Sequence, residues 1–219
     1  MPATIRTKAT DALLVIDLQA DFMPGGALAV GDGDAVVPIA NALMRRFDHV
    51  VVTQDWHPPG HASFASTHAA PPFSTKRLAY GDQTLWPDHC VQGAPGAALH
   101  PALDTDRAFL ILRKGMEPGV DSYSAFVEAD GRTTTGLAAL LSARRVKRVF
   151  CCGLATDFCV AHSALDARAA GFDVFVVEDA CRAIDADGSL DAAWARMNAA
   201  EVWRVQSREI LGWCMTPSG

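Results

Sequence analysis

Residues 148–177 read RVFCCGLATDFCVAHSALDARAAGFDVFVV, and this stretch carries the signals of two strands with a helix between them. Residues 148–152 and 173–177 are mainly apolar runs without two-residue alternation, as in strands buried on both faces. Residues 156–169 have the character of a helix, and Gly171 is a typical residue after a helix end. A strand, a helix and a second strand in this order predict a parallel pair joined by a crossover.

The same alternation of strands and helices continues on both sides of this stretch. Further strands are expected at residues 12–16, 49–53, 108–112 and 201–205, and further helices at 36–47, 136–145 and 190–200. We therefore predict an α/β fold, a three-layer α/β/α sandwich with a six-stranded parallel sheet. No repeat, low-complexity tract or linker interrupts the series, so residues 1–219 are expected to form a single domain.

One long segment, residues 55–107, departs from this alternation. It is rich in Pro, Gly, His and Ser and shows no clear helix or strand. A segment of this length without regular structure is usually functional when it belongs to a compact domain. Because most of the chain's histidines also fall here, a metal or substrate site is expected in this segment.

Composition and charge restrict the classes of partner. Half of the 219 residues are hydrophobic and 20% are charged, which is typical of a globular enzyme. A formal net charge of −6 without a basic block argues against nucleic acid. Because the sequence lacks a secretory signal and an apolar run of the ~20 residues that span a bilayer, we expect a cytoplasmic protein without a membrane partner. The sequence is compatible with both a monomer and a homo-oligomer.

The cysteines are expected to be free thiols. Their number is even, but six are few for this length, and no export signal accompanies them. They are Cys90, Cys151, Cys152, Cys159, Cys181 and Cys214. At least one of them is then available for chemistry.

Reactive side chains follow several of the predicted strands. Asp17, Asp55, Lys114 and Cys159 all fall at or just beyond a strand's carboxyl end, where doubly wound sheets bind their ligands. Each has an ordinary explanation by itself, as a helix cap, a solvated lysine or a small core residue. A carboxylate, an amine and a thiol at one sheet edge favour a catalytic site.

Cys159 is the candidate nucleophile. A thiol attacks as the thiolate, and the first turn of a helix, where Cys159 is expected, favours an anion. Lys114 adds a positive charge, while Asp17 can accept the thiol proton and return it to a leaving amine. The backbone N–H groups of Ala155 and Cys159 can bind the developing oxyanion.

The segments QDWHPPGH and WPDHC indicate a metal site. Asp55 and His57 lie two residues apart, so in an extended segment both side chains point the same way. Together with His89 they form a carboxylate and imidazole set that suits one divalent ion of zinc, iron or manganese. His61 fits equally well as a fourth ligand or as a hydrogen-bond donor behind the ligands.

Several segments, in the same order along the chain, resemble the nicotinamidase (pyrazinamidase) branch of the isochorismatase-like cysteine hydrolases. They are VIDLQADF and PGGAL near the N-terminus, QDWH, LWPDHCV, KG and GLATDFCV. The resemblance extends from residue 11 to about residue 183. It implies a six-stranded parallel sheet, a triad of Asp17, Lys114 and Cys159, a metal held by Asp55, His57 and His89, and a cis peptide between Leu154 and Ala155.

The resemblance also implies a reaction and a substrate pocket. Members of this branch hydrolyse nicotinamide to nicotinate and ammonia through a cysteine thioester, and the metal takes the pyridine nitrogen. Pyrazinamide is expected as a second substrate. The pocket positions that carry over are Phe22, Leu28, Trp86 and Tyr123, whose apolar faces would enclose a flat ring. Residues 128–135 resemble an insertion found in some members, and we expect this insertion to decorate the surface.

Two other functions compete with this one. An amidohydrolase acting on a carbamoyl or ureido substrate would share the triad but generally lacks the metal cluster, so Asp55, His57 and His89 disfavour it. A non-enzymatic binding protein with a structural metal would need a closed set of four ligands. Only three ligands stand out in the sequence, which leaves a position open for a substrate.

Overall fold

The structure is a computed structural model that describes residues 4–212, so Cys214 lies outside the described residues. Its main sheet has six parallel strands in the order β5-β2-β1-β6-β7-β8, which confirms the predicted α/β fold. The strands are β1 (Asp11–Ile16), β2 (His49–Asp55), β5 (Leu110–Lys114), β6 (Arg148–Leu154), β7 (Asp173–Arg182) and β8 (Trp203–Val205).

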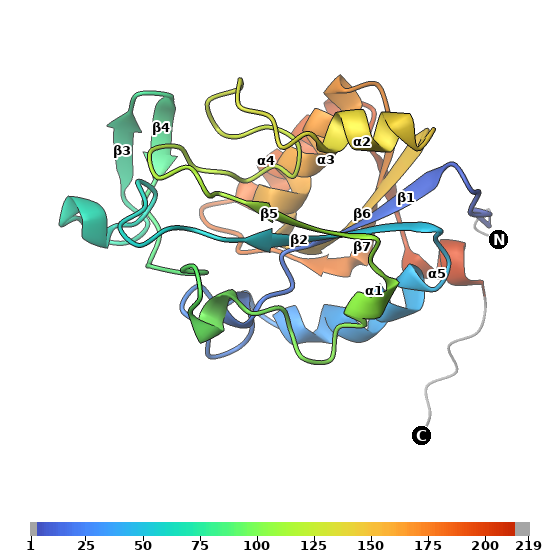
Figure 1. The fold of residues 1–219 in the computed structure, drawn as a ribbon, viewed down its shortest axis with the longest axis horizontal. Helices are drawn as coiled ribbons and strands as arrows, with labels where there is room; N and C mark the ends of the chain where they lie inside the picture. The colour runs from blue at the N-terminus through green and yellow to red at the C-terminus, as the bar shows by residue number, and fades with distance from the viewer. Residues whose placement is uncertain (1–3, 213–219) are drawn as a thin grey trace.

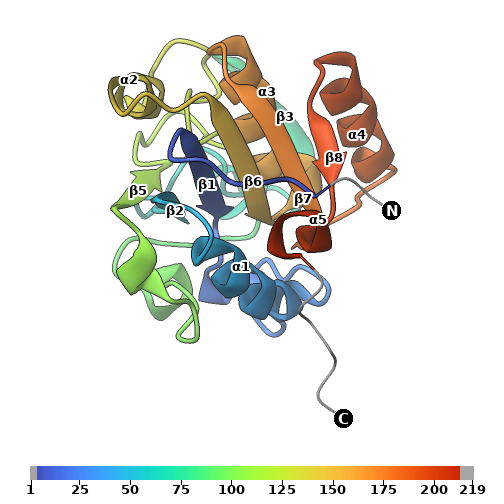
Figure 2. The ribbon, with the colours of Figure 1, turned by 90° about the vertical axis from the view of Figure 1, so that its right-hand side faces the viewer.

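Helices cover both faces of this sheet (Figures 1 and 2). On one face lie α2 (Leu137–Ala143), α3 (Ala161–Ala169) and α4 (Ser189–Ala199), and on the other lie α1 (Val37–Met44) and α5 (Ser207–Leu211). All six residues of β1 are buried, which explains why this strand reads as a continuous apolar run. Across residues 4–212, no helix combines the length and apolar character needed to cross a bilayer.

Short helical turns fill several of the connections. They are η1 (Ala20–Phe22), η2 (Gly33–Val36), η3 (Ser66–His68), η4 (Pro95–Ala97) and η5 (Thr105–Arg107), together with the π-helical turn η6 (Thr156–Val160). The helix predicted at residues 156–169 therefore begins as a π turn and continues as α3. The strand predicted at residues 173–177 extends to Arg182.

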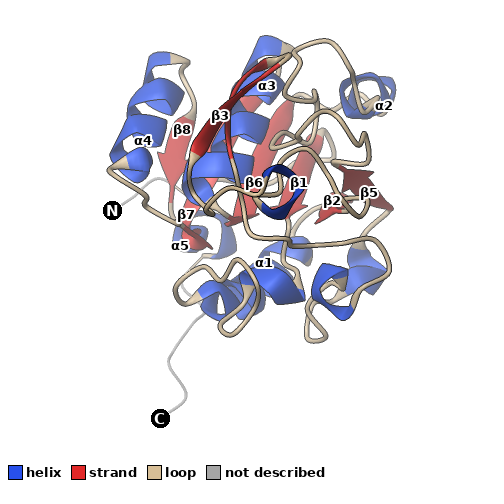
Figure 3. Ribbon diagram, turned by 90° about the vertical axis from the view of Figure 1, so that its left-hand side faces the viewer, coloured by secondary structure: helices blue, strands red, loops and turns tan. Residues whose placement is uncertain are grey.

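The prediction that residues 55–107 hold no clear element was wrong for part of that segment. An antiparallel hairpin of β3 (Thr75–Leu78) and β4 (Gly81–Thr84) projects there, in front of the main sheet in Figure 3. No residue of β3 is fully buried, and its sequence TKRL shows no alternation of apolar and polar residues. The hydrophobic pattern that identifies a strand is absent from it.

The carboxyl ends of all six parallel strands lie at one edge of the sheet (Figure 1). The connections that leave these strand ends also lie at this edge. The fit of β6 against β1 requires a glycine at this edge. Gly153 has a φ of +118°, and a Cβ there would lie 2.1 Å from the backbone oxygen of Ile16. Gly153 thus lets β6 approach β1 immediately before the segment that contains Cys159.

Candidate active site

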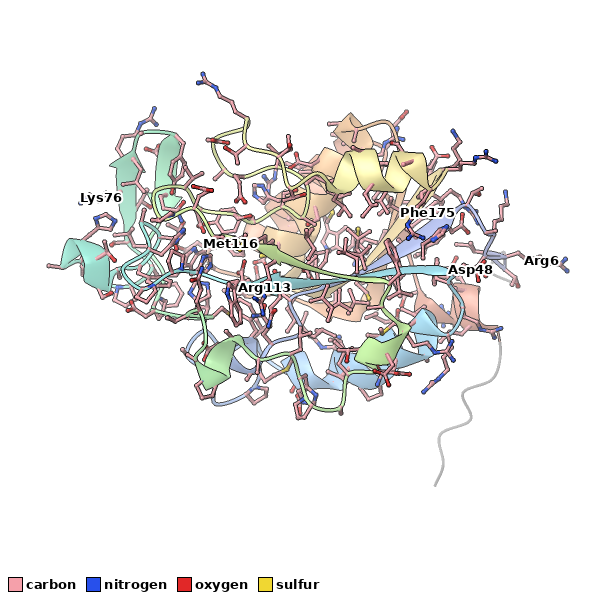
Figure 4. The ribbon with its side chains drawn as sticks, viewed as in Figure 1. Arg6, Asp48, Lys76, Arg113, Met116 and Phe175 are labelled. Atoms are coloured by element: carbon pink, nitrogen blue, oxygen red, sulfur yellow. The ribbon has the colours of Figure 1, made fainter. Side chains whose placement is uncertain are left out.

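Lys114 lies at the centre of the residues that the sequence singled out. It is the last residue of β5, and only 1% of it is exposed. Its near neighbours in the sequence, Arg113 and Met116, are labelled in Figure 4. Lys114 Nζ lies 2.6 Å from Asp55 Oδ1, 2.9 Å from Asp17 Oδ2 and 3.5 Å from Cys159 Sγ. The fold thereby brings together residues that end or follow four strands.

The charge of Lys114 is held by its two carboxylate neighbours. Burial by itself favours the neutral amine, but Asp17 and Asp55 outweigh it and raise the pKa of Lys114 well above its ordinary value. Burial would also raise the pKa of Asp55, yet Lys114 and His57 outweigh it and lower that pKa. The pair of Lys114 and Asp55 is therefore ionised at neutral pH.

At Asp17 the balance between burial and the charge of Lys114 is the reverse of that at Asp55. The pKa of Asp17 is raised, because burial outweighs the attraction of Lys114. Thr53 Oγ1 donates a 2.6 Å hydrogen bond to Oδ1, which holds the carboxylate in place. An oxygen of Asp17 lies within 4.8 Å of Cys159 Sγ. Asp17 is thus a carboxylate with increased proton affinity close to the thiol.

Cys159 lies in the π turn η6 and is 6% exposed. Burial raises the pKa of its thiol well above the ordinary value, and Lys114 only partly opposes this effect. The direction differs from the sequence-based expectation, in which the helix start and Lys114 favour the anion, because burial outweighs both. The thiol is protonated at rest, so attack requires a nearby proton acceptor.

The peptide between Leu154 and Ala155 is cis, as the resemblance implied. It joins the end of β6 to η6, and Ala155 and Cys159 both line the same cavity. Both ends of the short segment from Ala155 to Cys159 therefore reach the cavity.

Asp55, His57 and His89 converge in an arrangement that fits a divalent metal ion. Their ligand atoms all lie within 4.8 Å of one another. His57 Nδ1 lies 2.9 Å from the Gly115 carbonyl oxygen and His89 Nδ1 lies 2.8 Å from that of Pro87. Because a carbonyl only accepts, both Nδ1 atoms carry the proton, and both Nε2 lone pairs are available to a metal.

The protonation of the two histidines supports this fit. Burial lowers the pKa of His89 to about 4, so its ring is neutral at pH 7. For His57, burial also favours the neutral form, but Asp55 outweighs it and raises the pKa. The raised pKa of His57 means that Asp55 attracts a proton onto this ring. A divalent cation held beside Asp55 would supply the positive charge in place of that proton.

His61 lies outside this trio. Its Nε2 lies 3.0 Å and 3.1 Å from the carbonyl oxygens of Glu117 and Val120, and its Nδ1 lies 2.7 Å from Ser63 Oγ. Its ring stacks on that of His57, with 4.4 Å between centroids. Both ring nitrogens are engaged. One ligand atom of His61 also lies within 4.8 Å of ligand atoms of His57 and Asp121, so His61 neighbours the metal trio without belonging to it.

A cavity lies between the thiol and the metal trio. Four lining residues are those expected from the resemblance: Phe22, Leu28, Trp86 and Tyr123. Trp86 Nε1 donates a 3.0 Å hydrogen bond to Tyr123 Oη, which orients the indole, and Phe158 meets the indole edge-on at 4.9 Å between centroids. The walls are aromatic and suit a flat ring.

Comparisons with known proteins agree with this geometry. A family model described as the Isochorismatase domain matches residues 11–209. The chain belongs to the isochorismatase family. It is 54% identical to a nicotinamidase of Acinetobacter baylyi, over 91% of this chain and 94% of that protein.

Solved structures of proteins named nicotinamidase or pyrazinamidase also resemble this chain in fold. A nicotinamidase and pyrazinamidase of Acinetobacter baumanii superposes with a TM-score of 0.91 at 50% identity, over 92% of this chain and 98% of the other. A pyrazinamidase of Pyrococcus horikoshii in complex with zinc superposes with a TM-score of 0.73 at 37% identity, over 90% and 99%.

Some supporting residues of this isochorismatase-family site were missed in the sequence. Gln19 Nε2 donates to the Asp55 carbonyl oxygen at 2.8 Å, and Gln19 Oε1 accepts from the Asp55 N–H at 2.7 Å. Asp21 Oδ2 accepts from the Cys90 N–H at 2.7 Å, next to His89. Both residues belong to the segment VIDLQADF, which could have indicated them.

The expectation that residues 128–135 only decorate the surface was wrong for Glu128. Half of this insertion, residues 131–134, is exposed, but Glu128 is buried, and burial raises the pKa of its carboxyl. Together with Tyr80 and His162 it lines a second cavity, and Tyr123 belongs to the walls of both cavities. The insertion therefore lies beside the cavity that Cys159 lines.

Proposed function

We propose that this protein is a nicotinamidase, which hydrolyses nicotinamide to nicotinate and ammonia. One observation carries the proposal: Lys114 Nζ contacts both Asp17 and Cys159, and Cys159 lines an aromatic cavity. Such a cavity provides a nucleophile, a proton carrier and a surface for a ring at once. The similarity to proteins named nicotinamidase supports the same substrate.

Acylation begins with the Cys159 thiol. Asp17 takes the thiol proton, and the sulfur forms a bond to the carboxamide carbon of the substrate. Lys114 stabilises the transient thiolate, since its Nζ lies 3.5 Å from the sulfur. The Ala155 and Cys159 N–H groups stabilise the negative oxygen of the tetrahedral adduct. Asp17 then returns its proton to the amine, the C–N bond breaks, and ammonia leaves a thioester on Cys159.

Deacylation reverses these roles. A water molecule gives its proton to Asp17 and its oxygen attacks the thioester carbon. The C–S bond breaks, the proton returns to the sulfur, and nicotinic acid is released and ionises to nicotinate. The raised pKa of Asp17 suits a group that must both accept and donate a proton in one cycle.

The aromatic walls and the metal trio orient the ring. Phe22 and Trp86 supply apolar surface, so the ring is bound by burial as well as by shape. A divalent metal held by Asp55, His57 and His89 would act as a Lewis acid toward the pyridine nitrogen. Gly115 supports this trio, since its carbonyl orients His57.

Ammonia release from a panel of amides tests the proposal. Nicotinamide and pyrazinamide should be hydrolysed, whereas benzamide, which lacks the ring nitrogen, should be a poor substrate, and a linear ureide should release no ammonia. Cys159→Ala should abolish turnover without changing the thermal midpoint by more than a few degrees. A preference for the ureide over nicotinamide would instead assign the protein to the carbamoyl- and ureido-specific hydrolases.

A further inference from the structure

Asp157 is a buried carboxylate close to the nucleophile to which the mechanism above gives no role. It lies in η6, two residues before Cys159, and is 2% exposed. Its Oδ1 accepts from the Ile184 N–H at 3.1 Å, and its Oδ2 accepts from the Asp185 N–H at 2.8 Å and from Ser189 Oγ. A single side chain therefore binds three donors from one distant segment.

That segment connects β7 to α4 and forms part of the cavity wall. Residues 185–188 are exposed, whereas Ile184 is half-buried and lines the cavity with Cys159. Asp185 and Asp187 both have a φ of 52°, so the backbone is left-handed at these two residues and does not continue as a strand. An exposed connection of this kind keeps its position only through specific contacts.

The three donors explain why a carboxylate occupies position 157. Both oxygens of an ionised Asp accept hydrogen bonds, and all the partners are N–H or O–H groups. Among residues 4–212, no ion pair includes Asp157, so these hydrogen bonds alone compensate for its burial. An Asn at position 157 would replace one of the two acceptor oxygens with an NH₂ group. That group cannot accept a hydrogen bond from the N–H or O–H group that faces it.

We propose that Asp157 is a positioning residue that determines how tightly the cavity holds the substrate ring, acting through Ile184. Its turn also holds Cys159, so one short helical turn fixes both the attacking sulfur and the wall segment that contains Ile184. The ring is thereby held in register with the sulfur. This inference rests on the proposed nicotinamidase activity and adds a residue that controls its specificity.

The test compares Asp157→Asn and Ile184→Ala with the double variant, using ammonia release from nicotinamide. Each single change should raise KM about tenfold and leave kcat within about threefold, since Asp17, Lys114 and Cys159 stay in place. Because Asp157 acts through Ile184, the double variant should have nearly the same KM as the single variants. Both single variants should also discriminate less against 5-methylnicotinamide, which needs more room beside the ring.

Two further variants complete the design. Ser189→Ala removes one of the three hydrogen bonds far from the sulfur and should raise KM by about two- to fivefold. Asp130→Asn is the matched control, because Asp130 also accepts three hydrogen bonds, from Arg132 and Thr133, but does not line the substrate cavity. It should leave KM unchanged.

Different results separate the possible failures. If the wild-type protein releases ammonia but Asp157→Asn keeps the wild-type KM, or lowers kcat alone, the positioning role is wrong. Additive effects in the double variant would also overturn it. If Asp157→Asn does not fold by circular dichroism, an unchanged KM in Ser189→Ala and Ile184→Ala decides against the proposal. A wild-type protein without activity on nicotinamide refutes the proposed function instead.

Discussion

Replacing Lys114 by Met removes the cation that contacts both buried carboxylates, Asp17 and Asp55. Asp17 and Asp55 are 0% and 3% exposed, and both are within 3 Å of Nζ, at 2.9 Å and 2.6 Å. Removing one partner of a buried ion pair costs about 3–5 kcal/mol, because the remaining charge is left uncompensated. We expect Lys114→Met to lower the free energy of unfolding at pH 7 by this amount.

The loss should depend on pH in a defined direction. In the wild type, the pKa of Asp55 is lowered from 3.8, so its stabilising contribution is present above about pH 4 and disappears as the pH falls through the lowered value. In the variant, burial acts on both carboxyls without Lys114 to oppose it, so both pKa values should rise above those of the wild type, although His57 still opposes burial at Asp55. Their cost is then largest at neutral pH and falls as the pH approaches 4 and they take up protons.

Urea unfolding at pH 7 and pH 5, in EDTA and in excess zinc, measures this difference. Lys147→Met is the control, since Lys147 is exposed and its loss should change stability by less than about 0.5 kcal/mol. A loss of under about 1 kcal/mol in Lys114→Met at pH 7, or a loss that grows at pH 5, would show that Lys114 does not compensate the two carboxylates. Ammonia release should fall in the same variant by at least about a hundredfold.

Three further predictions concern the metal and the thiol. Chelation of the metal should raise KM for nicotinamide and leave the rate of Cys159 alkylation nearly unchanged, and equal kinetics with and without metal would rule out ring anchoring. Gly115→Ala should lower zinc affinity about tenfold or more, because a Cβ at this position would lie 2.4 Å from the His57 ring. Competition with a chromogenic chelator measures the affinity. An unchanged affinity would contradict the placement of His57. Among the described thiols, Cys159 should be alkylated first at pH 7.5, since it alone of them lines the substrate cavity. Asp17→Asn should slow this labelling. Equal labelling of Cys90 or Cys181, measured by mass spectrometry, would count against a proton acceptor beside Cys159.

The elements that could be predicted are those whose burial is expressed in local patterns. The strands at residues 12–16 and 148–152 are buried on both faces, so their apolar runs identified them. The hairpin of β3 and β4 escaped because exposed strands show no such pattern. For the same reason Ile184 was missed, since it precedes a run of exposed residues without periodicity.

The sequence by itself determined the order of strands and helices, and with it which reactive residues follow a strand end. Parallel strands must place their carboxyl ends at one edge, so Asp17, Asp55, Lys114 and Cys159 were expected to meet. Only the tertiary structure decided their electrostatics. Burial gives Cys159 a raised pKa, and carbonyl groups far away in the chain engage Nε2 of His61. The burial of these polar side chains and their distances to such partners are not written in any local pattern, because both result from packing the whole chain.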